Sequence, residues 1–273
     1  MSLQTLSEWL RCPNCLLPLH PSGELLLGCE RGHSFDVNKR GFVNLLAGPH
    51  KFIGDSATML EARDQFLKAG WYEPLRDIIR DIVAGEAPKR VLDVGCGTGY
   101  YLRAALPSGD NIRALGMDLS PTAVGRTIRS SERVDGLVAD VWSPLPVRDG
   151  AADLILNVFA PRNAAEFARV LRADGLLLVV VPQPSHLQQL RDSGLAVEMQ
   201  ADKAAHLTAS LGAWFTPEVH EQFGRTVQLT ASEVTSLIGM GPSAHHSRPA
   251  GVDPAGIDQV VTVAFDIFGF RRR

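Results

Sequence analysis

The segment that most restricts the fold of this chain is the run from Val91 to Gly99, with the sequence Val-Leu-Asp-Val-Gly-Cys-Gly-Thr-Gly. Its first four residues are typical of a buried strand, and the glycines at alternate positions predict a tight turn into a helix. Glycine lets the backbone approach a ligand closely, and amide groups at the start of a helix attract polar or charged groups. The segment therefore predicts an α/β fold with a cofactor at the end of its first strand.

The spacing of the glycines distinguishes two cofactor classes. A dinucleotide-binding turn reads G-x-G-x-x-G and is shaped around a pyrophosphate. Here Asp93 precedes the glycines, and its carboxylate would repel a phosphate but accept hydrogen bonds from an ammonium group. A second acid, Asp118, ends the next hydrophobic strand. This pattern predicts S-adenosylmethionine, whose methionyl end carries an amine, and it resembles the class I S-adenosylmethionine-dependent methyltransferases.

The length and the net charge of the chain limit its domain organisation and its binding partners. A chain of 273 residues is long enough for one α/β domain of about 200 residues and a small additional module. The formal charge of −3 argues against a protein that coats nucleic acid, so that any RNA contact requires a local basic patch. The sequence has no long apolar run and no signal-peptide pattern. We therefore expect a cytoplasmic protein with no membrane association.

The N-terminal cysteines predict a metal site. They form the pattern C-x2-C…C-x3-H with the residues Cys12, Cys15, Cys29 and His33. Three thiolates and one imidazole match the closed, tetrahedral coordination of structural zinc. Disulfides or free thiols are the alternative, and an odd number of thiols in a chain without a signal peptide disfavours disulfides. Residues 16–27 are expected to form a hairpin with its turn at 21–23.

The chain is expected to have three parts: a zinc-binding module at 1–38, a linker with helices at 39–87, and the catalytic domain at 88–273. Residues 34–53 are expected to be a loop between modules. Alternating strand and helix patterns from residue 89 onward predict parallel βαβ units. Two late strands suit a Rossmann-like, seven-stranded class I methyltransferase sheet in which the final strand is antiparallel. The expected strands are 90–94, 113–118, 136–140, 152–158, 175–182, 224–230 and 260–268, and the later helices include 98–106, 121–131, 163–171, 185–200, 202–211 and 231–239.

A narrower resemblance covers nearly the whole chain. The zinc pattern is followed by Gly-Phe-Val-Asn-Leu-Leu at 41–46, Gly-Asp-Ser at 54–56, Ala-Gly-Trp-Tyr at 69–72 and the glycine turn. This order resembles the RlmA family of ribosomal RNA guanine-N1 methyltransferases. Residues 157–163 and 240–243 further resemble the branch of that family that contains a tylosin-resistance methyltransferase. The resemblance implies methylation of N1 of a guanine in a hairpin loop of 23S rRNA, and a contribution to macrolide resistance.

The residues expected to bind the cofactor come from the motif and from this resemblance. Asp118 is expected to bind the ribose hydroxyls, with a helix-start acid as the alternative. The resemblance implies that Asp140 binds the adenine amino group, with a loop-capping acid as the alternative. It also implies cofactor contacts for Tyr72 and His186, the latter with a solvated helix-start histidine as the alternative. The full expected set is Tyr72, Asp93, Gly95, Gly97, Thr98, Gly99, Asp118, Asp140 and His186.

The target base is expected near the end of the fourth strand. Methyl transfer from a sulfonium is an in-line displacement and depends mainly on alignment. Asn157 lies where amine-directed methyltransferases place a polar residue, but the run Asn-Val-Phe-Ala-Pro departs from their Asn-Pro-Pro-Tyr form, which puts a direct transfer of roles in doubt. Asn157 and Phe159 are the expected catalytic residues, with Phe159 as simple core the alternative. Arg162 is expected to bind phosphate or the guanine edge, or to be a solvated helix-start residue. Cys96 is expected to be a small buried residue and not a nucleophile.

RNA binding is expected at the zinc-binding module, where cations interleave with aromatic residues. The residues are Arg31, Lys39, Arg40, His50 and Lys51 with Phe35, Phe42 and Phe52, and a packing or dimerisation module is the alternative. The residues 271–273, all arginine, are expected to be a solvated tail or a phosphate contact. Two other functions stay open: a small-molecule methyltransferase with a structural zinc ribbon, and a non-catalytic RNA-binding protein. The oligomeric state is open, with a homodimer as one option.

Overall fold

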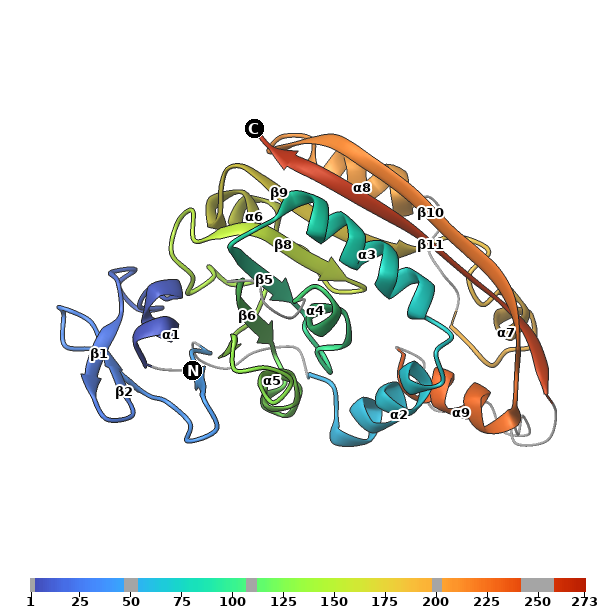
Figure 1. Ribbon diagram of the computed structural model, residues 1–273, viewed down its shortest axis with the longest axis horizontal. Coiled ribbons are helices and arrows are strands. Elements are labelled where there is room, and N and C mark those ends of the chain that lie inside the picture. Colours follow the sequence, from blue (N-terminus) through green and yellow to red (C-terminus); the bar gives the residue numbers. More distant parts are fainter. Residues whose placement is uncertain (1–2, 47–53, 107–111, 198–202, 242–257) are drawn as a thin grey trace.

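The computed structural model describes residues 3–46, 54–106, 112–197, 203–241 and 258–273. A large twisted sheet forms the body of the molecule, and the N-terminal residues form a small module at one end of it (Figure 1). We use the name N-terminal module for residues 3–38. Among the described residues, no helix has both the length and the hydropathy needed to cross a bilayer.

The main sheet confirms the class I methyltransferase fold. Its strands are β4 (Phe42–Asn44), β5 (Arg90–Val94), β6 (Arg113–Asp118), β7 (Val134–Val138), β8 (Ala152–Val158), β9 (Leu171–Pro182), β10 (Phe215–Leu229) and β11 (Gln259–Arg272). Their order is β10-β11-β9-β8-β5-β6-β7-β4. Strands β4 to β9 are parallel, and β11 is antiparallel to both of its neighbours. The antiparallel final strand is as expected, but within the described residues the sheet has eight strands and not seven.

The eighth strand comes from a segment that we expected to be a loop. Residues 42–44 form β4 and pair in parallel with β7, where Phe42 lies opposite Gly136. A Cβ atom at Gly136 would lie 2.6 Å from Cβ of Phe42 and 2.7 Å from a methyl group of Val124. Glycine at this position therefore makes room for the phenyl ring between the sheet and the helix that covers it. This packing depends on distant residues, so the local sequence does not show it.

Helices cover the sheet and flank its carboxyl edge. They are α1 (Leu3–Trp9), α2 (Ala57–Lys68), α3 (Glu73–Glu86), α4 (Tyr100–Ala104), α5 (Pro121–Ile128), α6 (Ala164–Val170), α7 (Gln188–Asp192), α8 (Lys203–Leu211) and α9 (Ala231–Gly239). The side chain of Ser56 accepts a hydrogen bond from the amide of Met59 and so begins α2. Helix α7 is much shorter than the expected 185–200, because Leu187 has a φ of 56° and Gly194 a φ of 72°. Both values are incompatible with a continuous right-handed helix.

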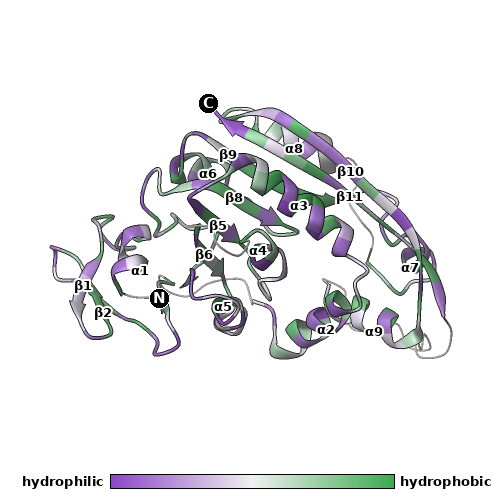
Figure 2. Cartoon of the chain, in the orientation of Figure 1, coloured by the Kyte–Doolittle hydropathy of each residue, from purple (hydrophilic) through white to green (hydrophobic). Residues whose placement is uncertain are grey.

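The last two strands form a long antiparallel ribbon. Strand β10 begins nine residues earlier than the expected 224, because its exposed polar residues pair with β11 along their whole length. Figure 2 shows hydrophilic bands along β10, whereas β8 and β9 are largely hydrophobic. The prediction of a solvated arginine tail is wrong for Arg271, which lies in β11 and forms ion pairs with Glu86 and Glu218.

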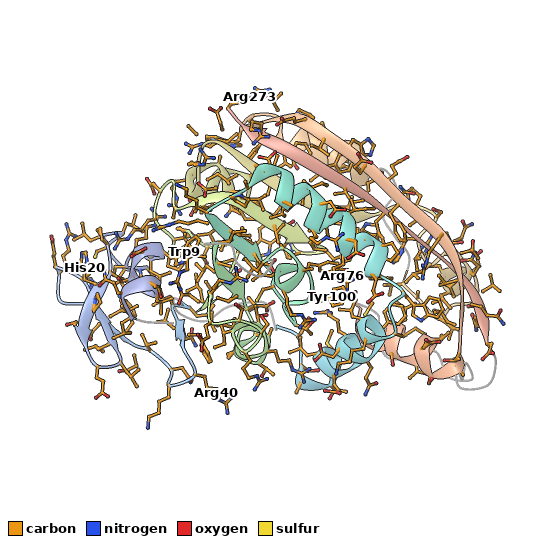
Figure 3. All side chains as sticks on the ribbon, viewed as in Figure 1. Trp9, His20, Arg40, Arg76, Tyr100 and Arg273 are labelled. Carbon is orange, nitrogen blue, oxygen red and sulfur yellow. The ribbon has the colours of Figure 1, made fainter. Side chains whose placement is uncertain are left out.

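The N-terminal module shares a hydrophobic core with the main sheet. Strands β1 (His20–Gly23), β2 (Leu26–Gly28) and β3 (Ser34–Asp36) form its small antiparallel sheet. The expected hairpin is confirmed, but its turn lies at residues 24–25 and not at 21–23. Leu6, Trp9 and Leu10 pack in one cluster with residues of the catalytic sheet such as Leu92. Figure 3 places Trp9 between the module and the sheet. The two parts are therefore packed together and not joined only by a flexible linker.

Candidate functional site

The four predicted metal ligands meet in one place. The Sγ atoms of Cys12, Cys15 and Cys29 and a ring nitrogen of His33 all lie within 4.8 Å of one another. The Sγ atoms of Cys15 and Cys29 are 3.6 Å apart, far beyond the disulfide bond length of about 2.05 Å. Three thiols and an imidazole at this separation fit tetrahedral zinc. All three cysteines of the cluster are free thiols, which excludes the disulfide alternative, and the cluster is a structural zinc site.

The environment of Cys29 favours its thiolate. Burial alone would raise the pKa of Cys29, but the backbone amide of Arg31 and the contacts with His33 and Cys15 outweigh this effect and lower the pKa to about 6. Metal ions bind cysteine as thiolate. The loop at Arg31 thus prepares this ligand for a metal cation.

The glycine turn joins the ends of β5 and β6. Gly95, Gly97 and Gly99 have φ values of 80°, 54° and 74°, which other residues adopt at a cost. At Gly95 a Cβ atom would also lie 2.4 Å from Cβ of Ala160. The amide of Gly97 donates a 3.0 Å hydrogen bond to Asp118, whose other oxygen accepts the amide of Ser120 at 2.9 Å. The carboxylate therefore lies against the turn, as a cofactor-binding acid should.

Two acids concentrate negative charge beneath this turn. Asp93 is buried, and burial together with the neighbouring Asp118 raises its pKa to about 8. Burial also raises the pKa of Asp118, although the hydrogen bonds from Ser120 and Gly97 oppose this shift. A buried carboxyl group without a cation is unfavourable. The ammonium group of S-adenosylmethionine fits this environment, because it would supply the missing positive charge.

An aromatic cluster lies beside the carboxyl edge of the sheet and brings together residues from distant segments. The ring of Phe265 lies 5.0 Å from Tyr72, 4.5 Å from His186 and 5.0 Å from Phe159, between ring centroids. The backbone amide of Ala264 donates to Nδ1 of His186 at 3.2 Å. The structure thus brings the predicted Tyr72, His186 and Phe159 together. Phe265 was missed because it reads as an ordinary core residue of the last strand.

Asn157 is fully buried at the end of β8. Its Nδ2 donates to the carbonyl oxygens of Pro161, at 3.0 Å, and Val94, at 3.4 Å. Since both partners are acceptors, the amide orientation is determined by them. Its Oδ1 has no hydrogen-bond partner among the described residues. Asn157 therefore shapes the loop that follows β8 and retains one acceptor for a donor group.

The same loop carries a strained aromatic residue and a cation. Phe159 has a φ of 57° and is 43% exposed, while its amide donates to Val180. A bulky residue with positive φ costs energy and often marks a functional site. The guanidinium of Arg162 donates to the carbonyl of Ala160, and burial lowers its pKa. An exposed ring and a half-buried cation thus flank the end of β8.

Other predicted residues have local structural contacts. Asp140 accepts the amide of Trp142 at 3.0 Å, which is the loop-capping alternative, and its adenine contact stays a prediction. Thr98 is buried at the turn. Cys96 is buried in the core, and burial raises its pKa well above the usual range, which confirms the structural interpretation.

Arg63 was also missed by sequence reasoning. Its Nη1 would lie 3.1 Å from a Cβ atom at Gly97, and it forms a 2.5 Å ion pair with Asp55. It also donates to the carbonyl of Met240. The Gly-Asp-Ser run at 54–56 marked this region in the sequence, but no motif pointed to an arginine in the middle of the next helix.

Only some of the predicted RNA-binding residues of the N-terminal region are exposed on the surface that the structure describes. Arg31, Lys39 and Arg40 are exposed, and Figure 3 shows Arg40 pointing away from the molecule. The expected place of Phe42 in this RNA-binding surface is wrong, because its ring is buried against the main sheet, and Phe35 packs against the shared core. His50, Lys51 and Phe52 lie outside the described residues, as do Pro242 and Ser243 of the 240–243 motif.

Comparisons with known proteins match both parts of the chain. Residues 10–52 match the family model of the RlmA N-terminal zinc ribbon, and residues 91–175 match that of a methyltransferase domain. The 23S rRNA (guanine(748)-N(1))-methyltransferase of Streptomyces fradiae is 40% identical over 89% of this chain and 88% of its own length. A relative from Micromonospora griseorubida, to which a 23S rRNA (guanine-N1)-methyltransferase activity is ascribed, is 39% identical over 93% of each chain.

Solved structures support the fold alone. The YcgJ protein from Bacillus subtilis has a TM-score of 0.50 and 16% sequence identity, and the match covers 71% of this chain and 97% of that one. This likeness concerns the sheet and its helices and indicates nothing about the substrate.

Proposed function

The chain belongs to the family of 23S rRNA (guanine-N1)-methyltransferases with an RlmA-type zinc ribbon, and from this membership we propose that it methylates N1 of a guanine in a hairpin loop of 23S rRNA. The observation that carries the proposal is the combination, in one chain, of a complete Cys3His cluster and a carboxylate-led glycine turn. Family membership disfavours a small-molecule enzyme and a non-catalytic RNA-binding protein.

The residues of the turn and the aromatic cluster are proposed to hold the cofactor. Asp93 faces the ammonium group, because its buried carboxyl group has no ion-pair partner among the described residues. Asp118 accepts the ribose hydroxyls with its remaining lone pairs. The backbone of the turn contacts the methionyl end at Gly95, Gly97, Thr98 and Gly99. Tyr72 and His186 form one wall beside Phe265. Asp140 binds adenine once its loop accommodates the ring.

The loop after β8 is proposed to receive the base. The bound cofactor supplies an electrophilic methyl group on a sulfonium. Transfer to N1 replaces the proton on that nitrogen, which leaves to solvent. The 2-amino group of the guanine donates a hydrogen bond to Oδ1 of Asn157, which has no partner among the described residues. Phe159 stacks on the base or faces the sulfonium, while Arg162 contacts the O6 edge. Alignment of N1 behind the methyl carbon would supply most of the catalysis.

The cellular setting follows from the proposed substrate. A base in a duplex cannot reach such a loop, so the target guanine is unpaired or flipped out. We propose that the protein acts in the cytoplasm, where ribosomal RNA is assembled. We also propose that the exposed cations in and directly after the N-terminal module, Arg31, Lys39 and Arg40, contact this RNA. The proposal also includes a contribution to macrolide resistance and a homodimeric state. It further divides the chain into three parts, with boundaries at residues 38 and 87.

Methyl transfer to unmodified 23S rRNA tests the function. Purified protein, methyl-labelled cofactor and a 23S rRNA fragment should give label on a single guanine. Reverse transcription should stop beside that guanine, because a methyl group on N1 blocks Watson–Crick pairing. The variant Asp118→Ala should bind the cofactor at least about tenfold more weakly, since it lacks charge-assisted hydrogen bonds, and should give no stop. Cofactor binding by the wild type without any label on rRNA would refute the proposed substrate.

A further inference from the structure

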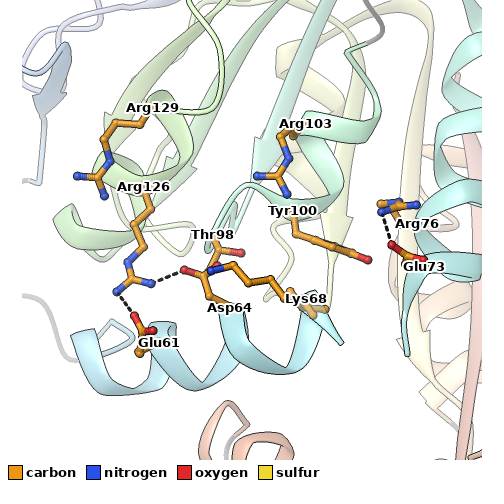
Figure 4. A pocket seen from close by; sticks show the side chains of 11 residues that line it. Glu61, Asp64, Lys68, Glu73, Arg76, Thr98, Tyr100, Arg103, Arg126 and Arg129 are labelled. Atoms are coloured by element: carbon orange, nitrogen blue, oxygen red, sulfur yellow. Dashed lines mark hydrogen bonds and ion pairs between the residues drawn. The ribbon is translucent and has the colours of Figure 1, made fainter. Parts of the chain in front are cut away.

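A basic cavity lies between α2, α3, α4 and α5, and of the residues that line it Thr98 alone is also assigned to the cofactor. Its volume is about 640 Å³. Five cationic side chains and three acidic ones line it, so that cations are in excess. Figure 4 shows the arginines of α4 and α5 directed into the space above α2. The cationic residues are Lys68, Arg76, Arg103, Arg126 and Arg129.

Three of these cations have no ion-pair partner within the part of the chain that the structure describes. Arg126 is neutralised by Asp64, at 2.5 Å, and Glu61, at 3.3 Å, and Arg76 pairs with Glu73 and Asp77. By contrast, Lys68, Arg103 and Arg129 are exposed and make no such contact. Unpaired like charges around a concave surface repel one another and produce a positive potential. This arrangement favours an anionic ligand with more than one charge.

One further group in the cavity wall lacks a partner. Tyr100 is 8% exposed, and its hydroxyl oxygen is buried without a hydrogen bond among the described residues. The guanidinium of Arg76 lies over its ring, 5.6 Å from the centroid. Guanidinium groups bind phosphate oxygens well, and a phenolic hydroxyl can donate a further hydrogen bond to them. The cavity thus contains both charged and neutral donors for a phosphate.

The cavity is close to the site proposed for the base. Thr98 of the glycine turn forms part of its wall. The ring of Tyr100 contacts Tyr101 at 5.1 Å, and Tyr101 contacts Phe159 at 6.3 Å, between centroids. These two successive contacts place the ring of Tyr100 at most a few nucleotides from Phe159, because even a stacked strand advances roughly 3.4 Å per nucleotide. A strand whose base enters beside Phe159 can therefore place neighbouring phosphates in the cavity.

We propose that this cavity binds backbone phosphates of the substrate RNA next to the target guanine. The proposal rests on the proposed function, since it takes the RNA as the occupant. It adds a second contact surface to the N-terminal module and positions the strand on the side of the cofactor turn. Lys68, Arg103 and Arg129 supply the cations, and Tyr100 supplies a neutral donor.

Charge changes in the cavity test this proposal through RNA affinity and its dependence on salt. Lys68→Glu should weaken binding of the 23S rRNA hairpin about tenfold, and Arg103→Gln with Arg129→Gln should do the same. Each lost phosphate contact should reduce the slope of log K against log salt concentration by about 0.7 to 0.9. Glu61→Gln should strengthen binding, because it removes an acid that competes with the phosphate for Arg126. A purely structural role of these residues would not produce this opposite effect.

The matched control is Lys89→Glu, which makes the same charge change at an exposed lysine just before β5, at the amino edge of the sheet. It should leave RNA affinity and the salt slope nearly unchanged, and all variants should keep the wild-type cofactor affinity by calorimetry. Equal RNA affinity and slope in Lys68→Glu, the double variant and wild type would overturn the cavity proposal alone. RNA binding that depends on the cavity supports it even if no methyl group is transferred, in which case only the proposed methylation fails.

Discussion

At the scale of single residues, Asp93 links the cofactor to protein stability. Its carboxyl group is buried beneath the glycine turn, and its pKa is raised to about 8 by burial and by Asp118. The ordinary value of an aspartate is about 3.9 in an unfolded chain. The folded protein without cofactor therefore holds a proton that the unfolded chain releases between these two values. Its stability should fall as the pH rises from about 4 to about 8.

The variant Asp93→Asn should raise the stability of the protein and lower its affinity for the cofactor. Without cofactor, it should be more stable than wild type at pH 8, because no charge is buried, and its unfolding temperature should depend less on pH. Its affinity for S-adenosylmethionine should nevertheless be lower by about 2 kcal/mol, since a hydrogen-bonded charge is lost. Thermal unfolding from pH 5 to 9, with and without cofactor, measures both effects. An unchanged affinity would contradict the role given to this carboxylate.

Asp135 in β7 provides a control for this experiment. It accepts a 3.1 Å hydrogen bond from Thr5, and burial raises its pKa to about 6. Its contribution to stability should therefore decline between about pH 4 and pH 6. Asp135→Asn should change the pH dependence of unfolding without changing cofactor affinity. The residue lies near the amino end of β7, which β6 separates from β5, whereas the turn follows the carboxyl end of β5.

At the scale of elements, α9 shows how a short helix is held in place. Thr230 accepts the amide of Glu233 at 3.3 Å, and Glu233 accepts the amide of Thr230 at 2.8 Å, which forms a capping box. The other carboxylate oxygen of Glu233 accepts the indole N–H of Trp71 at 2.7 Å. Since α9 packs on α2, this cap stabilises the helix pair that carries Arg63.

Thr230→Ala should destabilise the protein by about 1 kcal/mol, the usual effect of losing a side-chain cap. Thr230→Ser should stay close to wild type, since it keeps the hydroxyl acceptor. The midpoint of urea denaturation measures both variants. If alanine and serine gave the same midpoint, the cap would contribute nothing measurable.

The metal cluster is the second element whose contribution to stability can be tested. A chelator should unfold the loops and strands around Cys12, Cys15, Cys29 and His33, because a segment of this size buries too little apolar surface to fold alone. Helix α1 should stay folded, since Leu6 and Trp9 pack in the core shared with the main sheet. Hydrogen exchange should accordingly rise for residues 11–36 but not for Leu3–Trp9. Cofactor affinity should be largely retained, and RNA binding through this module should be lost.

At the scale of the whole molecule, the N-terminal module stabilises the catalytic domain. Arg11 pairs with Asp149 and Glu166, and Arg148 donates to the carbonyl oxygens of Leu10 and Leu19. The guanidinium of Arg90 lies 5.5 Å from the Trp9 ring centroid. Charged and apolar contacts therefore continue across the boundary that the sequence suggested at residue 38.

A chain that begins at residue 39 should consequently be less stable than the full chain, by several kcal/mol. Removal of Trp9 alone exposes apolar surface of the sheet, and loss of a large buried aromatic side chain costs about 3 to 5 kcal/mol. Calorimetric unfolding of the full and the shortened chain measures the difference. Equal unfolding temperatures would show that the shared core contributes little.

The sequence by itself determined the features that depend on local patterns. The glycine turn, the metal ligands and the strand ends at Val94 and Asp118 could be predicted, because backbone conformation and ligand chemistry demand particular residues at short spacing. The alternation of strands and helices also predicted the class I sheet. These signals are contained within a few neighbouring residues, so one sequence was sufficient.

Only the tertiary structure decided which distant residues meet. It placed Phe265 among Tyr72, His186 and Phe159, Arg63 against Gly97, and β4 at the edge of the sheet. It also formed the basic cavity from four helices whose lining residues extend from Glu61 to Arg129 in the sequence. The burial and the excess positive charge of this cavity come from side chains of several separate segments. No short stretch of the sequence therefore indicates them.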